Sequence, residues 1–317
     1  MSKLVSIVVA TYKNIDGLYE TLDSIFAQTY GNIEVIITDD GSPNFSDHIE
    51  KIESYYKNNA KENITNFEIR PLPVNGGTVK NLNNGLKYAK GDYIMTPAPE
   101  DIFTSNESIE HCVSFMENSD FLIAFGKMRG VTLDGEYKYE LISCESNYDL
   151  LKSYSIEDTL NRLFVRDFLP GPAWIARKEL FEKYGNFDED IRLVEDYPYW
   201  LHLALNKVRF GYIDEIVVDY KLSGVSSAGN YSEMFMKDMF KIYDKYIFPN
   251  DKRYGVLQGF YNFLKRSGLN YYMSEAKKED MTPGQRRAAR IKYLPFHIYV
   301  SMQNKKVEKK NKRIEKK

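Results

Sequence analysis

The sequence predicts an α/β protein whose doubly wound, mostly parallel sheet is followed by a C-terminal helical extension. Over residues 1–103, short apolar runs rich in β-branched residues alternate with segments of helical period. Polar or acidic residues follow several of these runs, where each strand would end. Beyond Ser227 the pattern is helical and aromatic only. We therefore expect two domains, residues 1–225 and residues 226–317.

The first hundred residues are expected to form a right-handed βαβαβαβ series. Apolar runs predict strands at Leu4–Ala10, Ile33–Thr38, Phe67–Leu72 and Asp92–Thr96. Amphipathic segments predict the helices between them at Ile15–Gln28, Ser46–Asn58 and Val79–Ala89. In the first of these helices, Leu18, Leu22 and Ile25 lie on one stripe, which is the side expected to face the sheet.

Strands and helices are mixed in the next hundred residues. Helices are predicted at Ser105–Asn118, Arg177–Tyr184 and Asp196–Ala204. Strands are predicted at Phe121–Lys127, Gly130–Leu133, Trp174–Ala176 and within Arg209–Tyr220. The region from Ser232 to Tyr272 is predicted to be helical throughout.

Composition narrows the class of protein. The chain has 317 residues, of which 43% are hydrophobic and 28% charged, a normal balance for a globular protein. Its two cysteines, Cys112 and Cys144, imply neither a disulfide framework nor a cysteine metal site. The apolar N-terminal run is too short for a signal peptide, and no run approaches the ~20 apolar residues that span a bilayer. We expect a cytoplasmic protein.

Positive charge gathers at the C-terminal end. Residues 281–317 hold 12 Lys and Arg against Glu308 and Glu315, although the whole chain has a net charge of −2. Apolar residues between Ile291 and Val300 precede the Lys-rich end. Such a segment can lie on an anionic membrane, here the inner face of the cell membrane; the alternative is a solvated basic end. No recognition motif accompanies the basic residues, so nucleic acid is not an expected partner.

Three acidic pairs indicate a polar site. Asp39–Asp40 follow the second predicted strand, Glu100–Asp101 follow the fourth, and Glu195–Asp196 open a later helix. In open α/β sheets, ligands bind outside the carboxyl ends of the strands. We expect the pairs to converge on one cleft of an enzyme that handles a charged, nucleotide-linked substrate.

Six stretches together resemble the family 2 glycosyltransferases with the GT-A fold. They are Val5–Asn14, Ser24–Tyr30, Glu34–Ser42, Asn75-Gly76-Gly77 with Asn81, Ala89–Ile94, and Gly185–Glu189 leading to Glu195-Asp196-Tyr197. The resemblance covers about residues 4–227. It implies inverting transfer of a sugar from a nucleotide-sugar donor, usually a UDP-sugar, to an acceptor hydroxyl. It also implies a Mn2+ or Mg2+ cofactor at the diphosphate and a glycan or lipid-linked acceptor in polysaccharide biosynthesis.

The resemblance assigns the donor site to three segments. Thr11, Tyr12 and Asp40 match the base-binding positions, and an acid there can accept a hydrogen bond from uracil while an aromatic ring stacks on it. Asp39 serves the ribose or orients the loop. The alternative is that Asp39 or Asp40 only caps a turn.

A glycine turn is expected to approach the diphosphate or its ribose. Asn75 precedes Gly76 and Gly77, and Lys80 and Asn81 stand at the start of the following helix. A basic or amide group near a helix N-terminus suits such a ligand. The alternative is an ordinary turn with a solvated lysine.

The expected metal motif departs from the family pattern. Where the family has Asp-any-Asp-Asp, this chain reads Ala98-Pro99-Glu100-Asp101. Asp101, with Glu100, still provides the one or two carboxylates that Mg2+ needs beside phosphate oxygens and water. The position of Ala98 contacts the sugar or ribose in the family, and here it lacks an acid. The alternative is that the two acids merely precede a helix.

The resemblance places catalysis at Glu195-Asp196. Asp196 is assigned as the base that takes the acceptor proton, and Glu195 as a residue that shapes the acceptor site. Trp174 is expected to stack on a sugar, or else to belong to the core. Two other functions remain open: a catalytically silent sugar-nucleotide-binding scaffold, suggested by Ala98, and a nucleotidyltransferase, whose Gly-rich signature is absent from the first strand.

Overall fold

The computed structural model describes residues 2–131, 137–139, 145–221, 232–277 and 280–293 of the chain. The chain divides into two compact units, residues 1–227 and residues 228–317. The first unit contains every residue that the sequence assigns to the site. The boundary predicted near residue 225 and the Lys-rich end beyond residue 293 lie outside the described residues.

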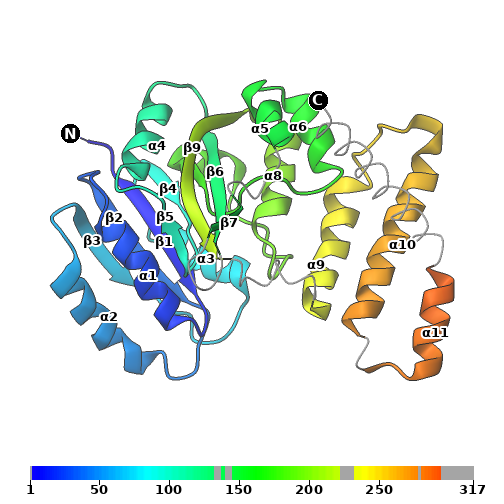
Figure 1. Cartoon of the computed structure of the whole chain (residues 1–317), viewed down its shortest axis with the longest axis horizontal. Coiled ribbons are helices and arrows are strands. Elements are labelled where there is room, and N and C mark those ends of the chain that lie inside the picture. Colours follow the sequence, from blue (N-terminus) through cyan, green and yellow to red (C-terminus); the bar gives the residue numbers. More distant parts are fainter. Residues whose placement is uncertain (1, 132–136, 140–144, 222–231, 278–279, 294–317) are drawn as a thin grey trace. The chain divides into compact units, whose positions relative to one another are not determined.

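One sheet runs through the first unit in the order β3-β2-β1-β4-β8-β6-β9-β5 (Figure 1). Its first four strands are β1 (Val5–Thr11), β2 (Ile33–Asp39), β3 (Ile64–Ile69) and β4 (Tyr93–Met95). These four strands are parallel, as predicted. The register of β1 and β2 places Thr11 beside Asp39. The two strands therefore deliver their polar residues to one edge of the sheet.

The other half of the sheet mixes strand directions. Its strands are β5 (Asp101–Phe103), β6 (Ile123–Val131), β7 (Tyr137–Tyr139), β8 (Trp174–Arg177) and β9 (Phe210–Lys221). Strand β8 is antiparallel to both β4 and β6, whereas β6 and β9 are parallel. Strand β5 pairs with the end of β9, also antiparallel. This edge pairing fixes Asp101 at the start of a strand.

Several elements differ from the sequence-based expectation. Strand β3 begins three residues before the predicted Phe67, and β6 is one strand where two were predicted. Strand β5 was not predicted, because three residues are too few to show a period. Helices α5 (Glu145–Lys152) and α6 (Ile156–Leu163) were not predicted.

Helices cover both faces of the parallel half of the sheet. The remaining helices of this unit are α1 (Ile15–Phe26), α2 (Ser46–Asn59), α3 (Thr78–Leu86), α4 (Ser108–Glu117), α7 (Lys178–Tyr184) and α8 (Asp196–Leu205). Leu18 and Leu22 of α1 share a buried cluster with Ile7 of β1. On α3, a Cβ at Gly85 would lie 2.3 Å from Cγ1 of Val8. Since Ile7 and Val8 face opposite sides of a strand, α1 and α3 pack on opposite faces.

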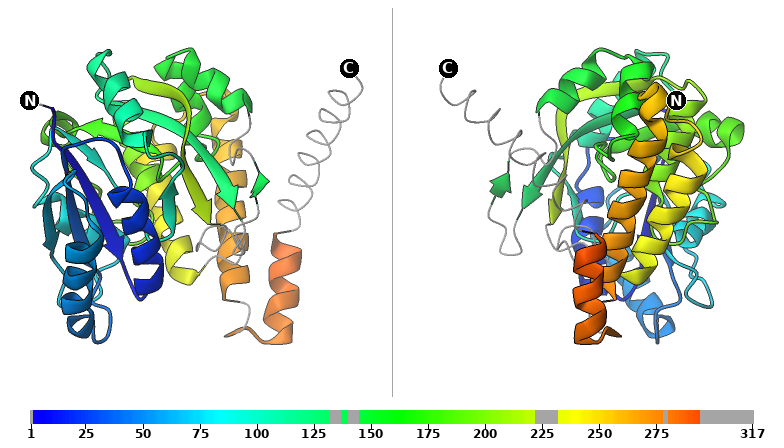
Figure 2. Two further views of the ribbon diagram at one scale, coloured as in Figure 1. Left: turned by 60° about the vertical axis from the view of Figure 1, so that its left-hand side comes forward. Right: turned by 90° about the vertical axis from the view of Figure 1, so that its right-hand side faces the viewer.

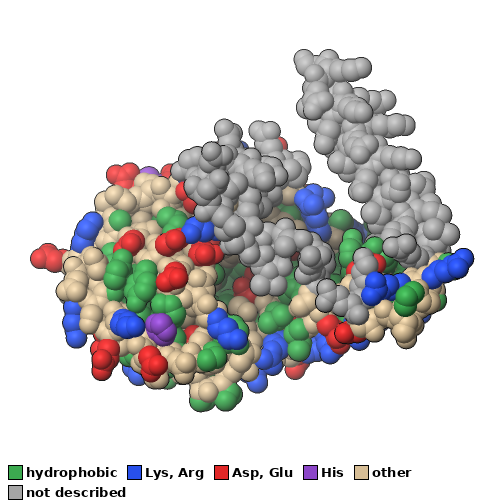
Figure 3. All heavy atoms as spheres, turned by 60° about the horizontal axis from the view of Figure 1, so that its bottom comes forward, with side chains coloured by type: hydrophobic (Ala, Val, Ile, Leu, Met, Phe, Trp, Pro, Cys, Tyr) green, Lys and Arg blue, Asp and Glu red, His purple; other side chains and the backbone are tan. Residues whose placement is uncertain are grey.

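The second unit is helical. Helices α9 (Glu233–Ile242), α10 (Gln258–Ala276) and α11 (Pro283–Lys292) run side by side within it (Figure 2). Asp251, in the connection before α10, is fully buried and pairs with Arg253 and Lys265. Among the described residues, no helix combines the length and apolarity needed to cross a bilayer. On the face shown in Figure 3, acidic and basic side chains are interspersed over the first unit.

Candidate active site

The carboxyl ends of β1 and β2 form the first wall of the site. The Asp40 N–H donates to the Thr11 carbonyl over 3.0 Å, and the Lys13 N–H donates to Ser42 Oγ over 2.8 Å. These bonds join the two loops that follow the strands. The Tyr12 side chain between them is 43% exposed, so its ring is available to a ligand. The stacking role expected for Tyr12 stays a prediction.

Asp39 bonds the turn that follows it in the sequence. It is fully buried, and its two oxygens accept hydrogen bonds of 2.6 Å from the N–H and the hydroxyl of Ser42. An ordinary turn-capping acid, the alternative that the sequence left open, therefore describes Asp39 better than a ribose ligand. Asp39 therefore orients the loop, the other role that the sequence allowed it, and a ribose contact stays a prediction.

Asp40 holds the glycine turn in place. Its carboxylate accepts hydrogen bonds from the Gly76 N–H at 2.7 Å and from the Gly77 N–H at 2.9 Å. Gly77 has a φ of 95°, a conformation that favours glycine. The guanidinium of Arg192 bonds the Asn75 side chain on the outside of the same turn. Arg192 was not singled out in the sequence, because only the fold brings it near residue 75.

Of the two candidates on α3, Asn81 is buried and Lys80 is exposed. Asn81 is 2% exposed, and its amide donates to the Thr11 carbonyl and accepts from the Thr38 hydroxyl. It therefore ties β1 to β2 and is not placed to touch a donor, which corrects the expectation. Lys80 is exposed in the first turn of α3 and has no ion pair within the described part of the chain. Lys80 remains a candidate for a phosphate contact.

The loop before β5 carries the two acids assigned to a metal. The buried Asp101 carboxylate accepts a 2.7 Å hydrogen bond from the Ala98 N–H. Burial, reinforced by the neighbouring charge of Glu100, raises the pKa of Asp101 to about 7. Glu100 has a φ of 76°, and its N–H donates to the Gly17 carbonyl. Ala98 thus contributes its main chain to the loop, where the family pattern has an acidic side chain.

Glu195 and Asp196 begin α8 as a half-buried pair. The pKa of Glu195 is raised to about 8, first by burial and then by the charges of Asp196, Asp167 and Asp101. Burial also raises the pKa of Asp196, although its carboxylate accepts a 2.7 Å bond from the Tyr197 N–H. The charge of Asp101 acts on Glu195, which joins two of the three acidic pairs, whereas Asp39 and Asp40 bond Ser42 and the glycine turn.

A further acid, Asp167, belongs to this site and was missed. It lies between α6 and β8, and burial together with the charge of Asp196 raises the pKa of Asp167 well above its usual value. The only sequence signal was its position four residues before Gly171-Pro172. That signal is weak, because nothing local distinguishes this acid from a solvated one.

Trp174 is a core residue rather than a sugar platform. Its side chain is 2% exposed and packs edge-to-face on Trp200, which in turn packs edge-to-face on Phe125. A sugar ring cannot reach a side chain enclosed in this way. The structure thus corrects the expected acceptor contact in favour of the alternative.

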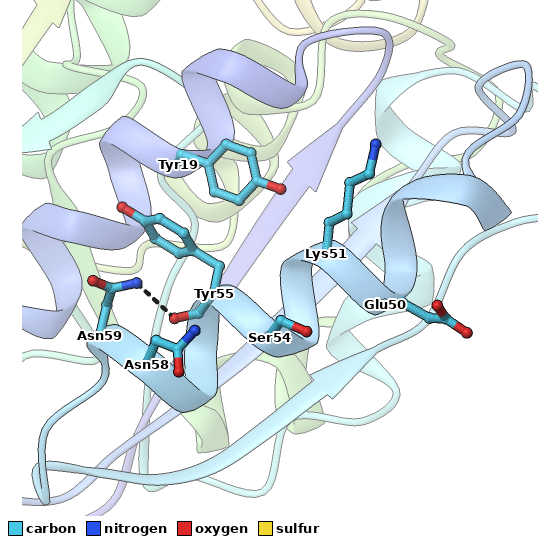
Figure 4. A pocket seen from close by; sticks show the side chains of 7 residues that line it. All are labelled: Tyr19, Glu50, Lys51, Ser54, Tyr55, Asn58 and Asn59. Carbon is cyan, nitrogen blue, oxygen red and sulfur yellow. Dashed lines mark hydrogen bonds between the residues drawn. The ribbon is translucent and has the colours of Figure 1, made fainter.

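A surface cavity of about 490 Å³ lies over α1 and α2, and none of the site residues lines it. In Figure 4, Tyr19 and Tyr55 face each other there, and Asn59 bonds the Tyr55 carbonyl. Within the described residues, no three acidic, histidine or cysteine side chains are close enough to form a metal site by themselves. A cation at Asp101 would therefore need oxygens from a ligand or water.

Sequence comparison identifies relatives of this chain. The model of glycosyl transferase family 2 matches residues 6–185. An uncharacterized glycosyltransferase of Rickettsia typhi is 30% identical over 224 residues, which are 66% of this chain and 61% of that protein. The uncharacterized glycosyltransferase EpsJ of Bacillus subtilis is 29% identical over 222 residues, 70% of this chain and 62% of that protein. The matches thus span less than two thirds of these relatives.

Structural comparison shows the same fold in known transferases. S. aureus TarS 1–349, in complex with UDP-GlcNAc, matches with a TM-score of 0.59 and 18% identity, covering 91% of this chain and 79% of that one. The mannosyltransferase PcManGT of Pyrobaculum calidifontis, in complex with GDP-Man and Mn2+, matches with a TM-score of 0.58 and 15% identity. That match covers 96% of this chain and 85% of the other. The predicted GT-A fold is thereby confirmed.

Proposed function

The chain belongs to glycosyl transferase family 2 and is a glycosyltransferase. We propose that it moves the sugar of a UDP-sugar to an acceptor hydroxyl with inversion of configuration at the anomeric carbon. The supporting observation is the acidic site itself, in which Asp196 stands beside Glu195 and the charge of Asp101 acts on Glu195. Three carboxyl groups in one half-buried site repel one another. Such a site suits proton acceptance and the binding of a cation.

We propose that the uracil base binds beside Tyr12, next to the Thr11 main chain. The exposed Tyr12 ring offers a stacking face, and Lys13 lies 5.0 Å from the centre of that ring. Asp40 would support this site by fixing the glycine turn, and the exposed Lys80, whose side chain lies beside Gly76, would contact the diphosphate. TarS binds UDP-GlcNAc and PcManGT binds GDP-Man, so both nucleotides belong in the binding test.

The acids of the β5 loop fit a divalent cation. Burial and the charge of Glu100 raise the pKa of Asp101, and no basic residue is among the causes that act on it. A cation would remove that repulsion. We propose that Asp101, with Glu100, would hold Mn2+ or Mg2+, which supplies charge neutralisation for the diphosphate leaving group. PcManGT, which shares the fold, was solved with Mn2+.

In the proposed reaction, Asp196 accepts the proton of an acceptor hydroxyl. That oxygen forms a bond to the anomeric carbon as the bond to UDP breaks, and UDP leaves with the electron pair. A raised pKa makes Asp196 a stronger base than an exposed aspartate. Burial and the neighbouring carboxylates raise the pKa of Glu195, which lies beside Asp196 and would contact the acceptor.

The acceptor is proposed to be a glycan or a lipid-linked glycan at an anionic membrane. This proposal rests on the basic C-terminal sequence, where residues 281–317 hold 12 Lys and Arg against two Glu. Each such residue near an anionic surface contributes about 1 kcal/mol to binding. Peripheral attachment through this end is compatible with a catalytic unit that stays exposed to the nucleotide-sugar.

Substitution of Asp196 tests the proposed mechanism. Asp196→Asn keeps the size of the side chain but removes proton acceptance, and we expect kcat to fall by about 10²–10⁴-fold. UDP affinity, measured by calorimetry, should remain near wild type. Glu195→Gln should change acceptor KM more than kcat. Turnover by Asp196→Asn at the wild-type rate would exclude Asp196 as the base, and a wild type without turnover on any UDP-, GDP- or dTDP-sugar would favour the silent scaffold.

A further inference from the structure

The segment between α7 and α8, residues 187–194, is bonded to α3 near both of its ends. Near its start, the Asn83 side chain donates to the Phe187 carbonyl over 2.9 Å and accepts from the Phe187 N–H over 3.2 Å. Near its end, the Arg192 carbonyl accepts a 3.2 Å hydrogen bond from the Val79 N–H. We call residues 187–194 the connecting segment, because they lead into the acidic pair at the start of α8.

The main chain of Arg192 takes the place of a helix cap for α3. A capping side chain accepts a hydrogen bond from the second or third N–H of a helix. The residue in the capping position of α3 is Gly77, which has no side chain to do so. Val79 is the second residue of α3, so the Arg192 carbonyl satisfies an N–H that a capping side chain would otherwise bond. The start of α3 therefore depends on the connecting segment.

The side chain of Arg192 holds the glycine turn itself. Its Nη2 donates to the Asn75 carbonyl over 3.2 Å and also to the side-chain oxygen of that residue. A Cβ at Gly77 would lie 2.4 Å from Cγ of Arg192, so the arginine stem lies directly against the turn. Asp40 bonds the N–H groups of the same turn. The turn is thus held between Asp40, at the end of β2, and Arg192 of the connecting segment.

We propose that Arg192 is a positioning residue that joins the glycine turn to the start of α8 and so sets the distance between the bound donor and the Glu195–Asp196 pair. The proposal rests on the proposed function, in which the turn lies on the donor side and Asp196 is the base. Arg192 is three residues before Glu195, and the intervening Val194 is buried. A displacement of about 1 Å in a site can lower the rate about a hundredfold. The link should therefore act on kcat.

The test is a double-mutant cycle between Arg192 and Asn75. Arg192→Met keeps an apolar stem but removes the donor, and Asn75→Ala removes the side-chain acceptor. With UDP-glucose, UDP-galactose and UDP-N-acetylglucosamine as donors and UDP release as the readout, each single variant should lower kcat by about tenfold. The double variant should be no slower than the slower single variant, because both changes break one link. Arg192→Lys keeps a donor on a long stem and should lose only about threefold.

The matched control is Arg209→Gln, which removes an exposed ion pair with Asp120. Its kcat should equal that of wild type. All rates are measured well below Tm, so that a variant that is only less stable keeps the wild-type kcat. A fall in kcat that is shared by Arg192→Met and Asn75→Ala therefore reports the geometry of the site.

Hydrogen exchange tests the link without any donor. Loss of the bond should let the glycine turn and the connecting segment open more often. Their main-chain N–H groups should then exchange about 5–20-fold faster in Arg192→Met and in Asn75→Ala than in wild type. The increase should be no larger in the double variant. Arg209→Gln should exchange like wild type in both stretches.

The outcomes separate this inference from the proposed function. Lower kcat and faster exchange in both single variants, without further loss in the double variant, support the link. A wild-type kcat in Arg192→Met, or losses that multiply in the double variant, would overturn the link and leave Asp196 as the proposed base. A wild type that releases UDP from none of the donors counts against the proposed function instead. Exchange then decides the link alone, and unchanged exchange in Arg192→Met overturns it.

Discussion

Replacement of Asp40 by alanine should destabilise the protein by about 2–4 kcal/mol. The Asp40 carboxylate accepts hydrogen bonds from the N–H groups of Gly76 and Gly77. A hydrogen bond to a charged group contributes about 1.5–3 kcal/mol, and an unpaired buried donor carries a similar cost. The N–H of the buried Gly77 should carry the full cost of losing its acceptor, whereas the N–H of the half-buried Gly76 can bond to water instead.

Urea unfolding measures the effect on the free energy of unfolding. Asp40→Asn keeps one acceptor oxygen and should lose roughly half as much as Asp40→Ala. The exposed Asp149, replaced by alanine, is the control and should change stability by less than about 0.5 kcal/mol. In calorimetry, Asp40→Ala should also weaken UDP binding by about 1–3 kcal/mol. A loss of stability below about 1 kcal/mol would show that the carboxylate does not hold the glycine turn.

Four other outcomes are expected. Turnover should stop in EDTA and return with Mn2+ or Mg2+; full activity in EDTA would show that Glu100 and Asp101 need no metal. Gly171→Ala should lower kcat by about tenfold or more with donor binding unchanged, because its Cβ would lie 2.9 Å from Oδ2 of Asp196. As pH is lowered, kcat/KM should begin to fall at a pH above the usual carboxyl range, because the pKa of Asp196 is raised and the reaction needs its ionised form. A value of kcat/KM that stays constant down to about pH 4 would contradict this. The full chain should bind anionic vesicles at low salt, and removal of residues 291–317 should release it; equal binding by both forms would exclude the basic end.

Local sequence patterns were sufficient for the first half of the sheet. The runs at Leu4 and Ile33 read as strands because apolar, β-branched residues follow one another without a break. Strand direction and right-handed connections then placed Thr11 and Asp39 at one edge. The convergence of Asp101 with the Glu195–Asp196 pair could also be expected, because each pair begins or follows an element of the predicted fold.

What each side chain does at that edge depended on tertiary contacts. Asp39 and Asp40 are adjacent in sequence, yet one binds Ser42 and the other binds a turn 36 residues away. Asn81 and Trp174 looked like ligands and proved to be buried partners of the protein itself. A sequence shows which groups are polar or aromatic, but not whether another segment already satisfies them.

Asp167 is a residue of the acidic site that the sequence alone did not reveal. The sequence determined that an acid stands between a helix and Gly171-Pro172, and it determined the acidic pair at the start of α8. Only the folded chain decided that the two would share one half-buried site, because residues 163 and 171 both contact α8. The pKa of a carboxyl group depends on the water it loses and on the charges brought near it. Both are set by segments far apart in the sequence.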